Sequence, residues 1–166
     1  MIVETERLTL REVDHGDASF ILELLNTPKF IQYVGDRCVR DLDAARRYID
    51  ERYLSGYREN GYGMWGVVER TSGKVIGACG FVRRESLPGP DIGFSFLPEF
   101  ERNGFGFESA AAVIEYGRER LGFKDVYAIT TLDNEESIRL LEKLGFTVER
   151  EIDFDGETLN LFSLTI

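Results

Sequence analysis

The stretch Leu97-Pro98-Glu99-Phe100-Glu101-Arg102-Asn103-Gly104-Phe105-Gly106-Phe107-Glu108-Ser109-Ala110-Ala111-Ala112 decides the fold of this 166-residue chain. It follows a strand-like run over residues 92–97 and opens a long amphipathic helix. A helix that begins just after a strand presents free backbone N–H groups and the positive end of its dipole, which together bind phosphate. Gly104 and Gly106 lack a Cβ, so their backbone can approach a bulky anion. The stretch predicts a phosphate-binding loop; the alternative is that the two glycines only shape a turn.

A dinucleotide-binding fingerprint fits this loop poorly. Its third glycine would fall at Ser109, and the fingerprint belongs on a βαβ unit near the start of its domain, whereas this loop lies past the middle of the chain. The phosphate ligand is therefore not expected to be NAD.

Apolar periodicity and turn residues predict the elements on either side of the loop. Residues 8–13 alternate as a strand, and a helix over 17–26 is expected to end at Pro28. Asp41 or Asp43 is expected to cap the next helix. Strands over 63–69, 75–82 and 92–97 precede the loop. The loop helix should bury Phe107, Ala110, Ala111, Ile114 and Leu121 and end before Gly122. A strand over 125–130, a helix over 135–144 and a hairpin over 146–152 and 159–165, turning at Asp155-Gly156, close the chain.

This order of elements predicts one α+β domain over residues 1–166, with a mixed sheet and helices on both faces.

The 30 acidic against 20 basic residues argue against a nucleic-acid partner, because phosphate backbones need clustered cations. The acidity suits a cationic substrate, or it serves only solubility. No run suits a membrane span and no signal peptide is evident, so a cytoplasmic location is expected. Cys38, Cys79 and the lone His15 show no metal-ligand spacing, so no metal site is expected.

A second segment, Asp133-Asn134-Glu135-Glu136-Ser137-Ile138-Arg139-Leu140-Leu141-Glu142-Lys143-Leu144-Gly145-Phe146, follows the loop helix and one strand. Together the loop and this segment resemble the GNAT superfamily of acyl-CoA-dependent N-acyltransferases. The run Glu4-Thr5-Glu6-Arg7-Leu8-Thr9-Leu10-Arg11 resembles the opening strand of its Rim-type branch, whose members acetylate ribosomal-protein N-termini. The resemblance covers nearly the whole chain and implies the GNAT fold, with a mostly antiparallel sheet.

The resemblance implies acetyl-CoA as co-substrate and assigns its binding residues. The pyrophosphate would lie on Arg102, Asn103, Gly104, Phe105, Gly106 and Phe107. The strand ending at Phe96 and Leu97 would splay from the strand over 126–130, and the pantetheine arm would lie in that gap. Asn134 would contact the arm or only cap its helix, and Lys143 would approach the adenosine phosphates. Glu101 and the bulky Phe107 depart from the family pattern, and Glu101 is expected to point outward.

Acyl transfer by direct attack in a ternary complex is expected, because no Cys/His or Ser/His pair supports a covalent intermediate. The resemblance suggests Ser137 as proton donor to the CoA thiolate. Asp91 is the candidate base; the alternative is a solvent-exposed turn aspartate after Pro88-Gly89-Pro90. Asn160 stands where some relatives carry an acid.

The expected acceptor is a small primary amine or a peptide N-terminus, recognised by residues 28–47 and the final hairpin. The candidate pocket residues are Tyr33, Arg37, Tyr57, Tyr62, Trp65 and Phe81. An alternative function is a catalytically inactive CoA-binding sensor or interaction module on the same fold. An exposed sheet edge near the final strand would permit a homodimer.

Overall fold

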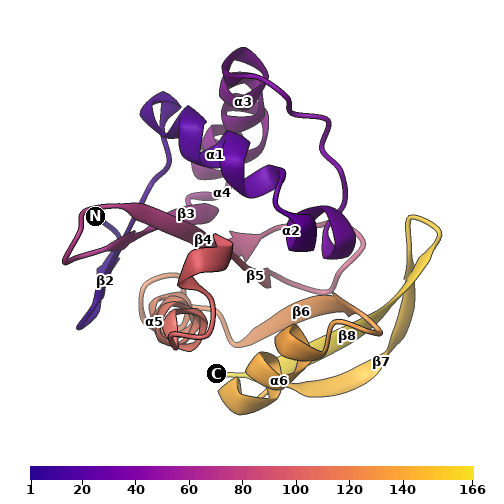
Figure 1. Ribbon diagram of the computed structural model, residues 1–166. Helices are drawn as coiled ribbons and strands as arrows, with labels where there is room; N and C mark the ends of the chain where they lie inside the picture. Colours follow the sequence, from indigo (N-terminus) through magenta and orange to yellow (C-terminus); the bar gives the residue numbers. More distant parts are fainter.

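One eight-stranded sheet runs through the computed structural model, which describes residues 1–166 (Figure 1). Its strands are β1 (Val3–Glu4), β2 (Leu8–Arg11), β3 (Met64–Glu69), β4 (Val75–Val82), β5 (Asp91–Phe96), β6 (Asp125–Thr131), β7 (Thr147–Phe154) and β8 (Glu157–Thr165). Their spatial order is β1-β2-β3-β4-β5-β6-β8-β7. Every neighbouring pair is antiparallel except β5 and β6. The predicted mixed, mostly antiparallel sheet is confirmed.

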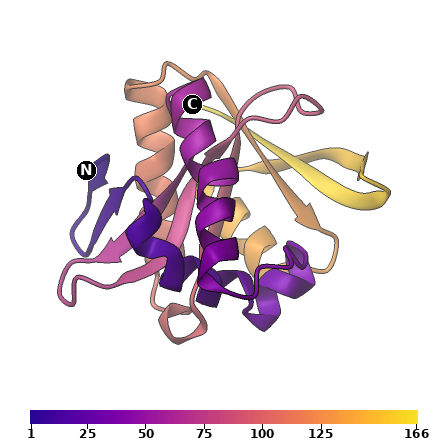
Figure 2. The ribbon, with the colours of Figure 1, turned by 90° about the horizontal axis from the view of Figure 1, so that it is seen from above.

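Helices cover both faces of the sheet, as predicted (Figures 1 and 2). One face carries α1 (Ala18–Leu25), α2 (Pro28–Tyr33), α3 (Leu42–Tyr48), a π-helix (Ile49–Leu54) and α4 (Ser55–Asn60). The other face carries α5 (Phe105–Glu119) and α6 (Glu135–Leu144). Single 3-10 turns occur at His15–Asp17 and Pro98–Phe100. No helix is long and apolar enough to span a membrane.

Two helical predictions need correction. Helix α1 ends before Pro28, as expected, but Pro28 then occupies the first position of α2, a helix that the sequence did not predict. The fixed φ of Pro28 suits a helix start, and the Thr27 side chain caps α2. Helix α5 ends at Glu119, before the predicted end at Gly122, and its buried residues differ from the predicted face. They are Phe105, Ser109, Ala110, Val113 and Gly117. Phe107 is therefore turned away from the core.

Strands β5 and β6 diverge almost at once. They share a single parallel pairing, Asp91 with Tyr127, whereas β5 pairs with β4 along its whole length, from Asp91 to Phe96. The backbone edge of β5 beyond Asp91 therefore lacks a strand partner on the β6 side. The splay that the resemblance predicted is present.

The largest part of the core lies between the sheet and α5, and it includes Trp65, Phe81 and Phe162, each at most 1% exposed. A second cluster under α1 and α3 contains Ile21 and Ile49. These two clusters pack the helices of each face against the sheet. The diverging strands β5 and β6 therefore lie between helices that are held by the core.

The final hairpin is confirmed, with its turn at Asp155 and Gly156. Both residues have positive φ, 51° and 82°, as a two-residue type I′ turn requires. The edge strand next to the final strand β8 is β7. It is largely exposed and rich in charged side chains. Charges of this kind discourage edge-to-edge pairing.

Candidate active site

A first cavity of about 560 Å³ lies between α2, β5, the start of α5 and α6. Its lining includes Phe96, Gly104, Gly106 and Phe107. The backbone N–H groups of residues 104–107 bind no protein acceptor; the first bonded amide is that of Glu108, which donates to the Gly104 carbonyl at 3.0 Å. The start of α5 therefore presents a row of free donors at the cavity, together with the positive end of the helix dipole.

The loop before α5 has an unusual backbone. Gly104 is left-handed with a φ of 80°, and Arg102 is left-handed with a φ of 62°. A non-glycine residue in this region costs on the order of 1 kcal/mol, and such strain is concentrated at functional sites. Arg102 extends into solvent with its side chain 84% exposed and lies 3.6 Å from a carboxylate oxygen of Glu136.

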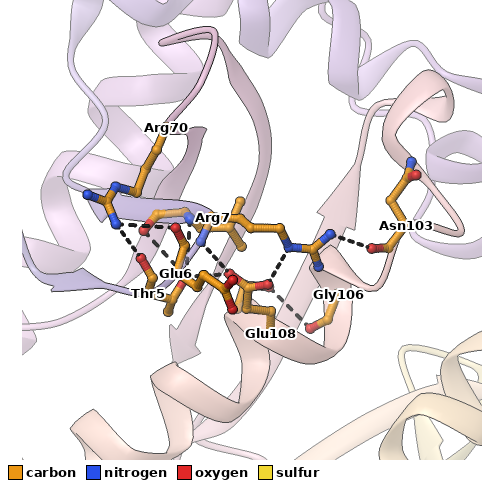
Figure 3. Close-up of polar contacts among 9 residues, drawn as sticks. Thr5, Glu6, Arg7, Arg70, Asn103, Gly106 and Glu108 are labelled. Carbon is orange, nitrogen blue, oxygen red and sulfur yellow. Dashed lines mark hydrogen bonds and ion pairs between the residues drawn. The ribbon is translucent and has the colours of Figure 1, made fainter.

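Arg7, from the turn before β2, fixes this loop (Figure 3). Its Nη1 donates to the carbonyl oxygen of Asn103 at 3.0 Å, and its Nε donates to Glu108 at 2.7 Å. Its guanidinium lies 4.4 Å from the centroid of the Phe105 ring. In a trans peptide the carbonyl and the following N–H point in opposite directions. With the Asn103 carbonyl bound to Arg7, the Gly104 N–H points away from Arg7.

Glu108 anchors Arg7 in turn. One carboxylate oxygen accepts from the Thr5 hydroxyl at 2.6 Å and from the Arg7 amide at 3.0 Å. Burial acts to raise the pKa of Glu108, but the hydrogen bonds from Thr5 and Arg7 outweigh it, so the pKa lies below its usual value. The carboxylate stays charged and keeps Arg7 oriented near neutral pH.

The first cavity is locally cationic in an acidic protein. It is lined by Lys29, Arg102, Arg139 and Lys143, against Glu101 and Glu136. The sequence analysis expected Glu101 to point outward, and this is wrong. Its carboxylate lies at the cavity and accepts a hydrogen bond from the Lys29 ammonium at 2.6 Å. The same ammonium binds Glu136 at 2.7 Å, which lowers the pKa of Glu136. Lys29 therefore acts as a shared counterion for the two carboxylates at the cavity.

The start of α6 lies where the first cavity meets a second. The Asn134 side-chain oxygen caps α6 by accepting from the Ser137 amide at 3.4 Å, and its NH₂ group binds no protein acceptor. Asn134 can therefore both cap the helix and donate to a ligand. The half-buried Ser137 lines both cavities. Farther along α6, the Lys143 ammonium lies 4.6 Å from the centroid of the Phe107 ring.

The second cavity, of about 320 Å³, continues from the first, and both share Phe94, Ser95, Asn134 and Ser137. Asp91 lines it at the point where β5 and β6 still pair, and this residue is 2% exposed. The alternative of an exposed turn aspartate is therefore wrong. Burial raises the pKa of Asp91 to about 6, opposed by Arg84, whose Nε lies 3.2 Å from the carboxylate.

Several predicted site residues lie outside both cavities. Leu97 is fully buried in the core, Phe105 is buried beneath Arg7, and Asn103 contributes its carbonyl to Arg7 instead of lining a cavity. Of the predicted acceptor-pocket residues, Tyr33 and Arg37 line the second cavity. The others do not: Tyr57, Tyr62, Trp65 and Phe81 pack in or against the main core.

The sequence analysis did not predict the roles of four site residues: Arg7, Lys29, Arg52 and Arg84. Each acts through a partner, or at a cavity, that lies far away in the chain or on another element. No local pattern marks such residues, because an exposed arginine or lysine is ordinary on any surface.

The comparisons with known proteins agree with this geometry. The family model described as "Acetyltransferase (GNAT) domain" matches residues 7–147. The chain is 33% identical over 149 residues to an uncharacterized N-acetyltransferase, YoaA of Bacillus subtilis, covering 89% of this chain and 84% of that protein.

Two solved structures share the fold. Spermidine N-acetyltransferase from Vibrio cholerae, in complex with CoA and spermine, has a TM-score of 0.79 at 18% identity, covering 97% of this chain and 96% of that one. RimL, a ribosomal L7/L12 alpha-N-protein acetyltransferase in complex with coenzyme A, has a TM-score of 0.81 at 16% identity, covering 99% and 97%.

Proposed function

Because the chain belongs to the GNAT family of acetyltransferases, we propose that it transfers an acetyl group from acetyl-CoA to a primary amine, a small amine or a protein N-terminus. The observation that carries this proposal is the meeting of two cavities at Ser137, one cationic with free backbone donors and one holding a buried carboxylate. Such an arrangement suits two substrates that react where their binding sites join.

The first cavity fits acetyl-CoA, which supplies the acetyl group as an activated thioester. The free N–H groups of residues 104–107, with Arg102, would hold the pyrophosphate. The Asn134 amide and the unpaired edge of β5 would hydrogen-bond the pantetheine arm in the manner of an added strand. Lys143 would approach the adenosine phosphates. This assignment keeps the expected roles of Phe96, Gly104, Gly106 and Phe107, which line the cavity.

Asp91 and Ser137 would move the protons. An acceptor ammonium must lose a proton before its nitrogen can attack, and the Asp91 carboxylate would take that proton, directly or through water. A pKa of about 6 leaves Asp91 mostly ionised at neutral pH and still basic enough to accept a proton. The Ser137 hydroxyl would donate a proton to the departing thiolate. Neither cavity is lined by cysteine or histidine, which supports direct attack rather than a covalent enzyme intermediate.

The proposal extends to the branch of the family, the location and the assembly of the protein. Kinship with the Rim-type branch is supported by the run over residues 4–11 and by the shared fold of RimL. A cytoplasmic location and a homodimer stay predictions; the charged β7 edge speaks against a dimer formed by edge pairing.

A ligand-dependent melting experiment tests the proposal first. Acetyl-CoA at about 100 times its Kd should stabilise the protein by about 2.7 kcal/mol, a melting shift of several degrees, while ATP and NADH shift it less. Thiol release from acetyl-CoA on addition of amines then tests turnover. Stabilisation without thiol release across a broad amine and peptide panel would favour an inactive CoA-binding sensor. Absence of any shift would refute acetyl-CoA as the ligand.

A further inference from the structure

The second cavity carries more positive than negative charge, although the whole chain has a net charge of −10. Its ionisable lining consists of the cations Arg37, Arg52 and Arg84 and the carboxylates Asp91 and Glu157, beside three tyrosines. The local potential of this cavity is therefore opposite in sign to the net charge of the protein. A cavity lined by cations favours a molecule that carries a negative charge.

The internal pairing leaves two of these cations free. Arg84 binds Asp91 at 3.2 Å and lies 5.4 Å from the centroid of the Phe154 ring. Arg37 and Arg52 make no ion pair and no side-chain hydrogen bond within the protein, although the neighbouring Asp36 and Asp50 are both paired, with Arg40 and His15.

The backbone that carries Arg52 is unusual. It belongs to the π-helix Ile49–Leu54, which lies between α3 and α4 and also turns Tyr53 into the second cavity. Segments of π-helix are rare and are frequently found at functional sites. Arg37 lines the same cavity from the loop between α2 and α3. The two arginines therefore come from segments that precede and follow α3 in the chain.

We propose that the acceptor is a small primary amine that also carries a carboxylate or phosphate, and that Arg37 and Arg52 bind this anionic group. The inference rests on the proposed function, because it names the substrate class for the same cavity. Guanidinium forks match carboxylate and phosphate oxygens in geometry as well as charge. A cavity of about 320 Å³ suits a small molecule.

The same charges disfavour a polyamine. A diamine or longer polyamine would bring a second ammonium toward two unpaired guanidinium groups. Of the two carboxylates in the cavity, Asp91 already pairs with Arg84, which leaves only Glu157 to offset them. This chain therefore shares the fold of a spermidine N-acetyltransferase, but its second cavity does not suit a polycationic acceptor such as spermidine.

A matched acceptor series tests the proposal: 1,4-diaminobutane, n-butylamine and 4-aminobutyrate each contain four carbons and one primary amine, and the group at the far end is cationic, neutral or anionic. Homologues of two to six carbons and 2-aminoethyl phosphate cover chain length and separate carboxylate from phosphate. Thiol release from acetyl-CoA is measured at fixed ionic strength, with rates corrected for the fraction of neutral amine. The anionic members should have a kcat/KM at least tenfold above their neutral and cationic counterparts.

Variants assign the effect to the two arginines. Arg37→Gln and Arg52→Gln should each raise the KM for the anionic acceptor roughly tenfold and leave the KM for acetyl-CoA unchanged. Arg47→Gln is the matched control, because Arg47 is exposed on α3 and lines neither cavity. Arg52→Glu should invert the preference toward the diamine.

A binding readout keeps the proposal testable if turnover is slow. With CoA present, 4-aminobutyrate or 2-aminoethyl phosphate should raise the melting temperature of the wild type but not of the double variant Arg37→Gln/Arg52→Gln. Diamines that turn over or stabilise as well as the anionic amines would overturn the inference while leaving the acetyltransferase proposal intact. Failure of acetyl-CoA itself to bind would refute the proposed function instead.

Discussion

The guanidinium of Arg7 donates a 3.0 Å hydrogen bond to the carbonyl oxygen of Asn103, a residue 96 positions later in the chain. This bond sets the plane of the peptide that precedes α5 and turns the Gly104 N–H away from Arg7. A rotated peptide would exchange that donor for a carbonyl oxygen, which repels phosphate. Arg7 therefore governs the geometry of a loop that it does not belong to.

Arg7→Gln should raise the KM for acetyl-CoA about tenfold, because the loop loses the bond that orients its donor, while kcat at saturation changes less than twofold. Steady-state kinetics with varied acetyl-CoA measure both constants. Arg70→Gln is the matched control: Arg70 binds Thr5 and Glu6 carbonyls at 2.8 and 3.2 Å and does not contact the loop (Figure 3). An equal rise in the control would mean that only the N-terminal hairpin matters.

Asp91 should give the reaction a pH dependence. The carboxylate must be ionised to take the acceptor proton, so kcat/KM should rise with pH through about 6 before the acceptor's own ionisation contributes. Asp91→Asn should lower kcat at least a hundredfold and abolish that limb of the pH profile. If the variant keeps the same limb, another group is the base.

The same residue should cost stability at neutral pH. Because the pKa of Asp91 is raised on folding, the folded state holds the proton more tightly than the unfolded state, and stability falls as pH rises from about 4 to about 6. Asp91→Asn should therefore stabilise the protein at pH 7.5 by on the order of 1–2 kcal/mol, with a smaller gain at pH 4.5. Urea unfolding at both pH values measures this, and a loss of stability at pH 7.5 would contradict it.

Ser137→Ala should lower kcat by about 10- to 100-fold and leave the Kd for CoA within twofold, since only the proton donor is removed. Ser95→Ala is the matched control, because Ser95 also lines both cavities but lies on β5. Single-turnover thiol release together with CoA titration separates chemistry from binding. Unchanged turnover in Ser137→Ala would remove the serine from the mechanism.

Lys29→Met should weaken acetyl-CoA binding about fivefold, because Glu101 and Glu136 would then face the phosphates without their shared counterion. The double variant Lys29→Met/Glu101→Gln should recover most of the affinity. Titration of CoA at low salt measures the effect, which higher salt should reduce. No recovery in the double variant would show that Lys29 acts directly on the ligand and not through the carboxylates.

Much of the fold follows from local patterns. The Asp155-Gly156 turn, the Asp41 cap of α3 and the start of α5 at the glycine-rich loop depend on neighbouring residues alone, and each lies as predicted. The buried face of α5 was mispredicted because apolar residues occur all around the helix, and the sequence does not say which of them faces the core and which, like Phe107, faces a cavity.

The site was predicted less completely, for a different reason. Residues that line a cavity through their own motif, such as Gly104 and Ser137, carry a local signal. The direction of the Glu101 side chain and the ion pair of Asp91 depend on Lys29 and Arg84, whose positions relative to them come only from the packing of separate elements.

The divergence of β5 and β6 divides the backbone hydrogen bonding of the sheet into two units, β1–β5 and β6–β8, that share one backbone pairing. Amide protons on the open edge of β5 should exchange rapidly in the free protein, while those paired with β4 stay protected. A ligand that fills the gap would join the units, so the resistance of the protein to local opening and proteolysis would follow the concentration of that ligand. The interrupted sheet would thus make the lifetime of the protein depend on the concentration of the ligand that fills the gap.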